Sequence, residues 1–296
     1  MTSEQEPSPP AGARLGFLTA LALAAFAGNS LLCRAAAALP GFDPGVFTLV
    51  RLFAGGFTLA LITWPRRKRF HPGAGSWIAG MALLVYAAGF SWAYLRLTAG
   101  TGALLLFGAV QATMNFAAWR SGERPGRLAL AGLGLALFGL AVLIAPGLAA
   151  PPPLAALSML GAGIAWGIYS LRGRGSRDPL ADTAANFSRA SFVATMTFFV
   201  FALVKRPLFP GLPGLSLVYA ALSGAITSGL GYAVWYKALR GLTATRAALV
   251  QLAVPPLAAL GGTLLLGEAP TLRLVAASLL ILGGIAIGIT GRREKA

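Results

Sequence analysis

Apolar residues fall into ten long runs, separated by short stretches rich in polar residues, proline or glycine. Each run has about the 20 residues that an α-helix needs to cross the hydrocarbon layer of a bilayer. The pattern therefore predicts an all-α membrane protein with ten transmembrane helices. We expect them near residues 15–38, 44–64, 76–95, 99–119, 127–145, 153–171, 183–204, 214–236, 243–266 and 271–290.

The composition supports this prediction. Of the 296 residues, 57% are hydrophobic and 11% are charged, too few polar residues to cover a soluble core. The ten runs use up nearly the whole chain, which excludes a cytosolic enzyme with a membrane tail. Glycine and alanine within the runs favour close helix packing and hence a compact bundle. The single cysteine, Cys33, cannot form an intrachain disulfide.

The net charge of +16 would suggest nucleic-acid binding in a soluble chain. Here the basic residues form short clusters between the apolar runs. Successive loops lie on alternate sides of the membrane, and the basic residues are distributed unequally between the two sides. One side holds 17 and the other 5, while Arg51 and Arg189 lie inside spans. The richer side is predicted to be cytoplasmic, which places both termini there and argues against a nucleic-acid partner. The poorer side holds Arg34, Arg96, Lys205, Arg206 and Arg273.

Residues 1–13 are predicted to form a disordered cytoplasmic tail. A signal peptide is the alternative, because Arg14 precedes an apolar run and Ala35 to Ala38 resemble a cleavage region. Glu4, Glu6 and several prolines make this segment a poor positively charged leader.

Several motifs occur twice. Leu97-Thr98-Ala99 recurs as Leu242-Thr243-Ala244, and Gly122-Glu123 recurs as Gly267-Glu268, both displaced by 145 residues. We therefore expect two five-helix repeats, residues 14–148 and 149–291, followed by a cytoplasmic tail at 292–296. Five is an odd number, so the second repeat must cross the membrane in the opposite sense, as in many secondary transporters. Shorter matches pair Phe26 with Trp166, Ser30 with Ser170 and Arg51 with Arg189.

The second repeat carries the most diagnostic residues. Residues 242–251, then Val254-Pro255-Pro256 and Gly267-Glu268, resemble the drug/metabolite transporter superfamily, specifically its ten-span EamA-type branch. The resemblance covers about residues 15–290 and is greatest to aromatic amino acid exporters of the YddG kind. It implies a secondary transporter of a bacterial inner membrane that exports small amphipathic metabolites, including aromatic amino acids, by alternating access and without ATP. Val110 departs from the pattern, because the second repeat has Pro255 at the equivalent position.

The acidic residues restrict the coupling chemistry, because none lies in the middle third of a predicted span. A buried carboxylate is the usual means of coupling transport to protons, so facilitated transport is favoured. Two alternatives remain: a proton-coupled drug or metabolite antiporter, and a non-transporting scaffold or lipid-binding protein. The acids are Glu4, Glu6, Asp43, Glu123, Asp178, Asp182, Glu268 and Glu294.

Enzyme chemistry finds no support in the sequence. The single histidine, His71, lies in a basic loop, and no metal-ligand cluster, catalytic triad or phosphate-binding loop occurs. We therefore predict no catalytic activity, no metal and no cofactor. The predicted partners are a small-molecule substrate and the lipid bilayer, with a monomer sufficient for activity.

A carrier needs a cavity near the midplane where helices break and polar groups replace water. Pro255 falls near the middle of the ninth predicted span, with Gln251 four residues earlier on the same helical face. A packing kink is the alternative for this pair. Aromatic walls with a few amides suit an amphipathic ligand, although core packing would explain the same residues. The substrate-binding candidates are Asn29, Tyr86, Phe90, Gln111, Trp166, Tyr169, Tyr232, Trp235, Gln251 and Pro255.

Arg51 and Arg189 lie inside predicted spans. We expect each to reach the headgroups along its aliphatic stem or to cap a neighbouring helix. Binding of a substrate carboxylate is the alternative.

Overall fold

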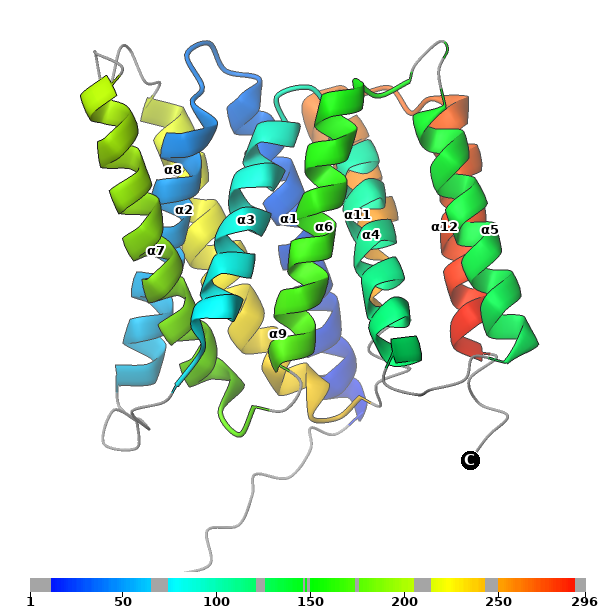
Figure 1. Ribbon diagram of the computed structural model, residues 1–296, viewed down its shortest axis with the longest axis horizontal. Coiled ribbons are helices and arrows are strands. Elements are labelled where there is room, and N and C mark those ends of the chain that lie inside the picture. Colours follow the sequence, from blue (N-terminus) through cyan, green and yellow to red (C-terminus); the bar gives the residue numbers. More distant parts are fainter. Residues whose placement is uncertain are drawn as a thin grey trace, which may run out of the picture.

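The computed structural model describes residues 12–64, 74–120, 126–145, 147, 150–173, 176–204, 214–242 and 250–290. Within these residues the regular structure is entirely helical, as predicted, and the helices lie side by side in one bundle (Figure 1). The helices are α1 (Gly12–Ala37), α2 (Pro44–Thr63), α3 (Trp77–Ala93), α4 (Ala99–Arg120), α5 (Arg127–Ile144), α6 (Pro153–Gly173), α7 (Pro179–Val204), α8 (Gly214–Leu222), η2 (Ser223–Leu230), α9 (Gly231–Leu239), α11 (Val254–Leu266) and α12 (Leu272–Thr290).

Among the described residues, six helical units are long and apolar enough to cross a membrane: α1, α2, α4, α5, α6 and the continuous unit α8–η2–α9. Helices α3, α11 and α12 are shorter apolar helices. Large apolar side chains such as Phe57, Leu264 and Leu279 point outward and are more than half exposed. A water-soluble protein rarely exposes so much apolar surface, whereas lipid tails would cover it favourably.

The predicted helix positions agree with the observed ones to within a few residues, except in the ninth. There, residues 243–249 lie outside the described part of the chain, Leu252 and Ala253 form a turn, and α11 begins only at Val254. Pro255 therefore lies in the first helical turn, where a missing backbone donor costs little. The expectation of a proline in the middle of a continuous helix is wrong, and so is the shared helical face of Gln251 and Pro255.

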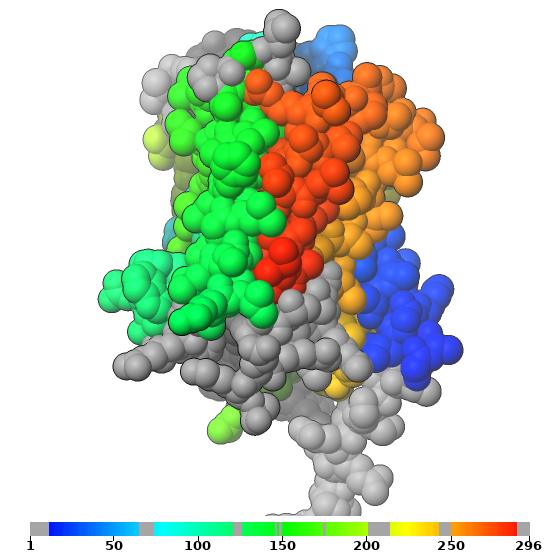
Figure 2. Space-filling model, turned by 90° about the vertical axis from the view of Figure 1, so that its right-hand side faces the viewer, coloured from blue at the N-terminus to red at the C-terminus, as the bar shows by residue number. Residues whose placement is uncertain are grey.

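The helices pack in a regular scheme. Helix α6 packs against α3 and α4, while α1 packs against the unit α8–η2–α9 and against α11. Three further pairs are α2 with α7, α4 with α11, and α5 with α12. The last pair forms one end of the bundle, where both helices run along each other over their length (Figure 2).

Helices α5 and α12 approach closely because glycines face each other. A Cβ atom on Gly284 would lie 2.6 Å from the carbonyl oxygen of Gly132, too close for any larger residue without movement. Small residues allow this contact between backbones, which is a common source of helix association in membranes.

The described chain begins and ends at the same face of the bundle, which is at the bottom of Figure 1 and is called the lower face here. The described basic residues at helix ends are unequally divided between the two faces. The upper ends carry Arg34, Arg96 and Arg273, and the lower ends carry Arg14, Arg120, Arg127, Arg172, Arg177, Lys237 and Arg240.

Candidate functional site

Asn29 lies in the second half of α1, buried at the centre of the bundle. Its Nδ2 donates a hydrogen bond to the hydroxyl of Tyr86 on α3 at 3.1 Å. Its Oδ1 accepts hydrogen bonds from Ser223 at 2.6 Å and Thr227 at 3.3 Å, both on η2. Both polar atoms of this buried amide therefore have partners, and Asn29 joins three helices at one point.

The partners of Asn29 depend on a π-helix. Residues Ser223–Leu230 form η2 between α8 and α9, and its wider turns direct the hydroxyl groups of Ser223, Thr227 and Ser228 toward α1 and α2. Gly224 allows α2 to lie against η2, because a Cβ atom there would collide with the carbonyl oxygen of Arg51. Single turns of π-helix inside longer helices occur frequently at functional sites.

An aromatic cluster surrounds Asn29. Trp166 on α6 lies at its centre, with ring centroids 4.8 Å from Tyr86, 5.3 Å from Tyr232 and 5.3 Å from Tyr169, on which it stacks. Phe26 on α1 contacts Tyr232 edge-on at 6.1 Å. Trp166 and Tyr169 thus share a face of α6, and Tyr86 contacts Phe90 on α3 at 5.5 Å.

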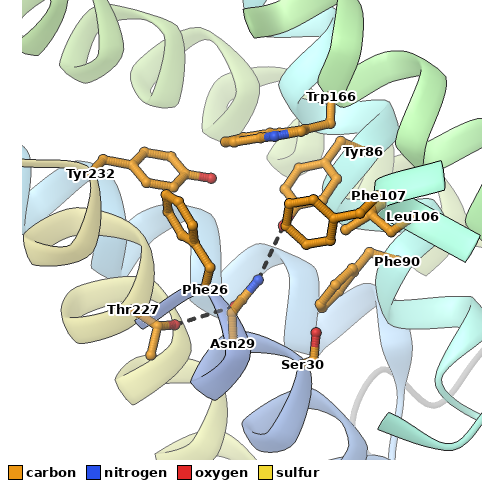
Figure 3. A pocket seen from close by; sticks show the side chains of 10 residues that line it. All are labelled: Phe26, Asn29, Ser30, Tyr86, Phe90, Leu106, Phe107, Trp166, Thr227 and Tyr232. Atoms are coloured by element: carbon orange, nitrogen blue, oxygen red, sulfur yellow. Dashed lines mark hydrogen bonds between the residues drawn. The ribbon is translucent and has the colours of Figure 1, made fainter. Parts of the chain in front are cut away.

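A cavity lies between these side chains (Figure 3). The rings of Phe26, Trp166 and Tyr232 face it from one side, with Asn29 on the other. The space is small: the centre of a water-sized sphere can move within only about 20 Å³. That is room for one or two water molecules, so a larger ligand requires the rings to move apart. The cavity is lined by Phe26, Asn29, Ser30, Tyr86, Phe90, Leu106, Phe107, Trp166, Thr227 and Tyr232.

Of the ten candidates from the sequence, five line this cavity: Asn29, Tyr86, Phe90, Trp166 and Tyr232. Tyr169 and Trp235 contact lining residues without lining the cavity themselves. Tyr169 stacks on Trp166, and Trp235 contacts Phe26 edge-on at 5.6 Å. Gln111, Gln251 and Pro255 do not line it.

Sequence reasoning left Phe26, Ser30, Leu106, Phe107 and Thr227 out of the candidate list, although they line the cavity. The repeat offered a clue, because Phe26 and Ser30 match Trp166 and Ser170. Thr227 belongs to the run Ser-Gly-Ala-Ile-Thr-Ser-Gly, whose hydroxyl groups inside an apolar segment could have drawn attention.

Arg51 is the largest of the fully buried side chains, with 2% of its surface exposed. Its Nη2 donates to the Tyr86 hydroxyl at 2.9 Å, and its Nε donates to Ser228 at 3.4 Å. Its guanidinium lies over the rings of Tyr86 and Phe90, 5.1 and 4.9 Å from their centroids. The expectation that Arg51 reaches the headgroups is wrong, because its side of α2 faces the hydroxyls of α3 and η2 inside the bundle.

Arg189 contacts the segment that precedes α3 rather than the carbonyl end of a helix. Its Nη1 donates to the carbonyl oxygen of Ala74 at 2.9 Å, and its guanidinium lies over the ring of Trp77. It therefore holds α7 to the segment where α3 begins, away from the cavity.

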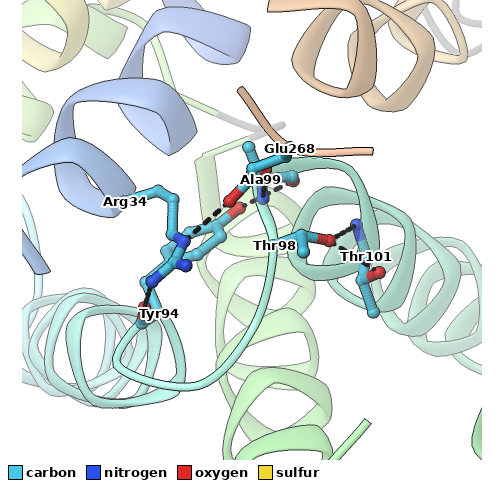
Figure 4. A network of polar contacts seen from close by, with 6 residues as sticks. All are labelled: Arg34, Tyr94, Thr98, Ala99, Thr101 and Glu268. Atoms are coloured by element: carbon cyan, nitrogen blue, oxygen red, sulfur yellow. Dashed lines mark hydrogen bonds and ion pairs between the residues drawn. The ribbon is translucent and has the colours of Figure 1, made fainter. Parts of the chain in front are cut away.

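An ion pair lies at the upper face of the bundle (Figure 4). Arg34 Nε at the end of α1 lies 2.7 Å from Glu268 Oε1, just after α11. Glu268 Oε2 accepts a hydrogen bond from the backbone of Ala99 at 2.8 Å, and Arg34 also donates to the carbonyl oxygen of Tyr94 at 3.3 Å. Gly267 has φ 67°, a left-handed conformation that turns the chain so that Glu268 faces inward.

A second set of polar contacts, between hydroxyl groups, lies toward the lower face. The hydroxyl of Tyr169 donates to Thr183 at 3.2 Å, and Thr183 lies 3.1 Å from the hydroxyl of Tyr236. These bonds join α6, α7 and α9 below Trp166. The aromatic cavity therefore lies between two layers of polar contacts.

Residues 153–290 match the EamA-like transporter family. An uncharacterized protein of Pseudomonas aeruginosa is 54% identical over 279 residues, which cover 94% of this chain and 96% of the relative. Residues 153–290 therefore form an EamA-like transporter domain. With its apolar helices, this makes the chain a multi-pass membrane transporter.

Two other relatives are more distant. One from Streptantibioticus cattleyicolor, named "Probable terminal-alkyne amino-acid exporter", is 27% identical over 87% of this chain and 89% of its own. An uncharacterized transporter from Archaeoglobus fulgidus is 36% identical over 33% of this chain and 39% of its own. The chain also superimposes on a solved crystal structure of a protein with a TM-score of 0.66 and 21% sequence identity. The match covers 96% of this chain and 99% of the other. The EamA-like transporter thus shares its fold with a solved structure.

Proposed function

We propose that this EamA-like transporter is a secondary carrier that exports small amphipathic metabolites, amino acids with aromatic members among them, by alternating access. The observation that carries the proposal is the central cavity, where the rings of Phe26, Trp166 and Tyr232 oppose the amide of Asn29. Such a site offers apolar contact to the body of a ligand and hydrogen bonds to its polar head. The relative named an amino-acid exporter supports this substrate class.

Alternating access requires that each face can close. The Arg34–Glu268 pair covers the upper side, and the contacts of Thr183 with Tyr169 and Tyr236 cover the lower side. In the proposed cycle, a state with both layers formed and little free space between them would be the occluded one. Breaking one layer at a time would expose the cavity to one side only.

Two inverted five-helix repeats would provide the symmetry for such a cycle. The packing supports this arrangement: α6 contacts α3 and α4 in the same way that α1 contacts α8–η2–α9 and α11. The pairs α2–α7, α4–α11 and α5–α12 each join equivalent helices of the two repeats. We place both termini in the cytoplasm of a bacterial cell, because the lower face carries most of the described basic helix ends.

The proposed transport is facilitated rather than proton-coupled. The four described acids, Asp43, Asp178, Asp182 and Glu268, lie at or beyond helix ends rather than beside the cavity. A carboxylate next to the substrate would be the usual proton carrier.

Flux measurements in liposomes test the proposal. Purified protein is reconstituted into liposomes. Uptake of radiolabelled aromatic and aliphatic amino acids is then measured by exchange, with and without a pH gradient. We expect saturable exchange that persists when an ionophore removes the gradient. Flux that collapses with the gradient would favour the proton-coupled antiporter, and no saturable flux across the panel would favour a non-transporting role.

A further inference from the structure

Arg51 carries a positive charge that nothing in the described part of the chain neutralises. Asp43, Asp178 and Asp182 each accept a hydrogen bond from a backbone N–H, and Glu268 pairs with Arg34. All four lie at helix ends, whereas Arg51 lies inside α2 with 2% of its surface exposed. A buried cation without a counter-charge is costly, and contacts with aromatic faces offset only part of that cost.

The guanidinium also has unused hydrogen-bonding capacity. Its Nη1 is buried and makes no hydrogen bond with any residue that the structure describes. The other two nitrogens donate to Tyr86 and Ser228. Buried donors are nearly always paired, so this free donor calls for an acceptor. Arg51 does not itself line the cavity, but it hydrogen-bonds to Tyr86, which does.

A second donor points to the same chemistry. The hydroxyl of Tyr86 accepts hydrogen bonds from both Asn29 and Arg51, and no hydrogen bond among the described residues uses its own hydrogen. Tyr86 lines the cavity, and the Arg51 guanidinium lies against its ring. The cavity wall thus offers the Tyr86 O–H, and the cationic guanidinium of Arg51 lies directly behind the same side chain.

We propose that Arg51 and Tyr86 together bind the carboxylate of the transported substrate, so that the carrier selects for molecules bearing a carboxylate. This inference rests on the proposed transport function and narrows it. The carboxylate would accept from the Tyr86 hydroxyl and from Arg51 Nη1, supplying the missing counter-charge, while the apolar body contacts Trp166, Tyr232 and Phe26. Space for the ligand arises when the aromatic rings separate as one face opens.

The test uses four related compounds: L-phenylalanine, 3-phenylpropionate, L-phenylalaninamide and phenethylamine. The first two carry a carboxylate and the last two do not. Binding is measured as the ligand-induced rise in melting temperature of the whole protein in detergent, and transport as competition for flux in liposomes. With the natural protein we expect the two compounds that carry a carboxylate to bind about 10- to 100-fold more tightly than the two that lack it. Only the carboxylates can form the charge-assisted hydrogen bond with Arg51.

Variants separate recognition from folding. Arg51→Met should reduce the preference for carboxylates to about threefold or less, and Arg51→Lys should restore part of it, since a cation remains. Tyr86→Phe should weaken carboxylate binding about tenfold with little effect on the amines. Arg189→Met is the control: it removes a partly buried contact on α7 and should leave the preference unchanged.

The outcomes are distinct. If the natural protein binds and transports the amines as well as the carboxylates, or if Arg51→Met weakens all four compounds equally, the carboxylate site is wrong while the transporter assignment stands. If no compound in this panel or among aliphatic amino acids binds or moves, both proposals fall. If Arg51→Met does not fold, the comparison on the natural protein and Tyr86→Phe still decide.

Discussion

Glu268 and Arg34 meet 2.7 Å apart, although 234 positions separate them in the chain. Their ion pair joins the end of α1 to the segment after α11 and also holds the backbone of Ala99 at the start of α4. Three helices are thus tied at the upper face by one carboxylate. This geometry suggests that the pair opens when the upper side of the cavity opens.

Glu268→Gln should loosen this upper closure. The variant loses the charge of the pair but keeps its size, at a cost of about 1–2 kcal/mol for a partly exposed, charge-assisted contact. Cys33, the single cysteine, is fully buried one residue before Arg34 and serves as a natural reporter. We expect its labelling by a membrane-impermeant maleimide to become about tenfold faster.

The control for this labelling is Asp43→Asn, which alters a helix cap at the same face and should leave Cys33 protected. Equal labelling rates in the natural protein and Glu268→Gln would show that the ion pair does not control access from this side.

Asn29→Ala should destabilise the centre of the bundle. The change leaves Tyr86, Ser223 and Thr227 without their shared partner, and an unsatisfied buried group costs about 1–3 kcal/mol. We expect a lower melting temperature in detergent together with a strong loss of flux.

Asn186→Ala is the matched control for Asn29, because Asn186 is also buried and accepts a hydrogen bond from the backbone of Ser76 at 2.8 Å, away from the cavity. It should lower stability but retain flux. Similar transport defects in both variants would argue against a direct role of Asn29 in the site.

Trp166→Ala should raise the apparent KM for aromatic substrates about tenfold, whereas Trp166→Phe should raise it by only about threefold. Trp166 contacts Tyr86, Tyr169 and Tyr232, so the indole both shapes the cavity and offers a stacking surface. The measurement is initial exchange rate against substrate concentration in liposomes. Trp119→Ala is the control, since that indole is 62% exposed on the outside of the bundle; an equal effect there would mean that the loss is not specific to the cavity.

Gly284→Ala should separate α5 from α12. The added methyl group would lie 2.6 Å from both Gly132 O and the backbone nitrogen of Ala136, and overpacking of this kind costs about 1–3 kcal/mol. Gly283→Ala, at the neighbouring position, is the control, because a Cβ atom on Gly283 meets nothing within 4 Å. Thermal unfolding in detergent should therefore distinguish the two variants, and equal melting temperatures would contradict the close approach of the two helices.

Helix positions could be predicted because each follows from a local property, the length of an apolar run. Half of the candidate residues line the cavity for a similar reason: Tyr86 with Phe90, and Trp166 with Tyr169, share helical faces that spacing alone reveals. The failures involve long-range contacts. Arg51 was expected at the headgroups because nothing in the sequence shows that α3 and η2 surround it with Tyr86 and Ser228.

The sequence by itself determined that the chain is a bundle of apolar helices with its acids at the ends, because hydropathy and charge are properties of single residues and short windows. Only the tertiary structure decided which polar groups meet at the centre. Asn29, Tyr86 and Arg51 come from three helices, and the π-helical turns of η2 alter the direction of Ser223 and Thr227 in a way that no regular period predicts. Hydrogen bonds act over about 3 Å, so they depend on how the helices pack rather than on how the residues are spaced.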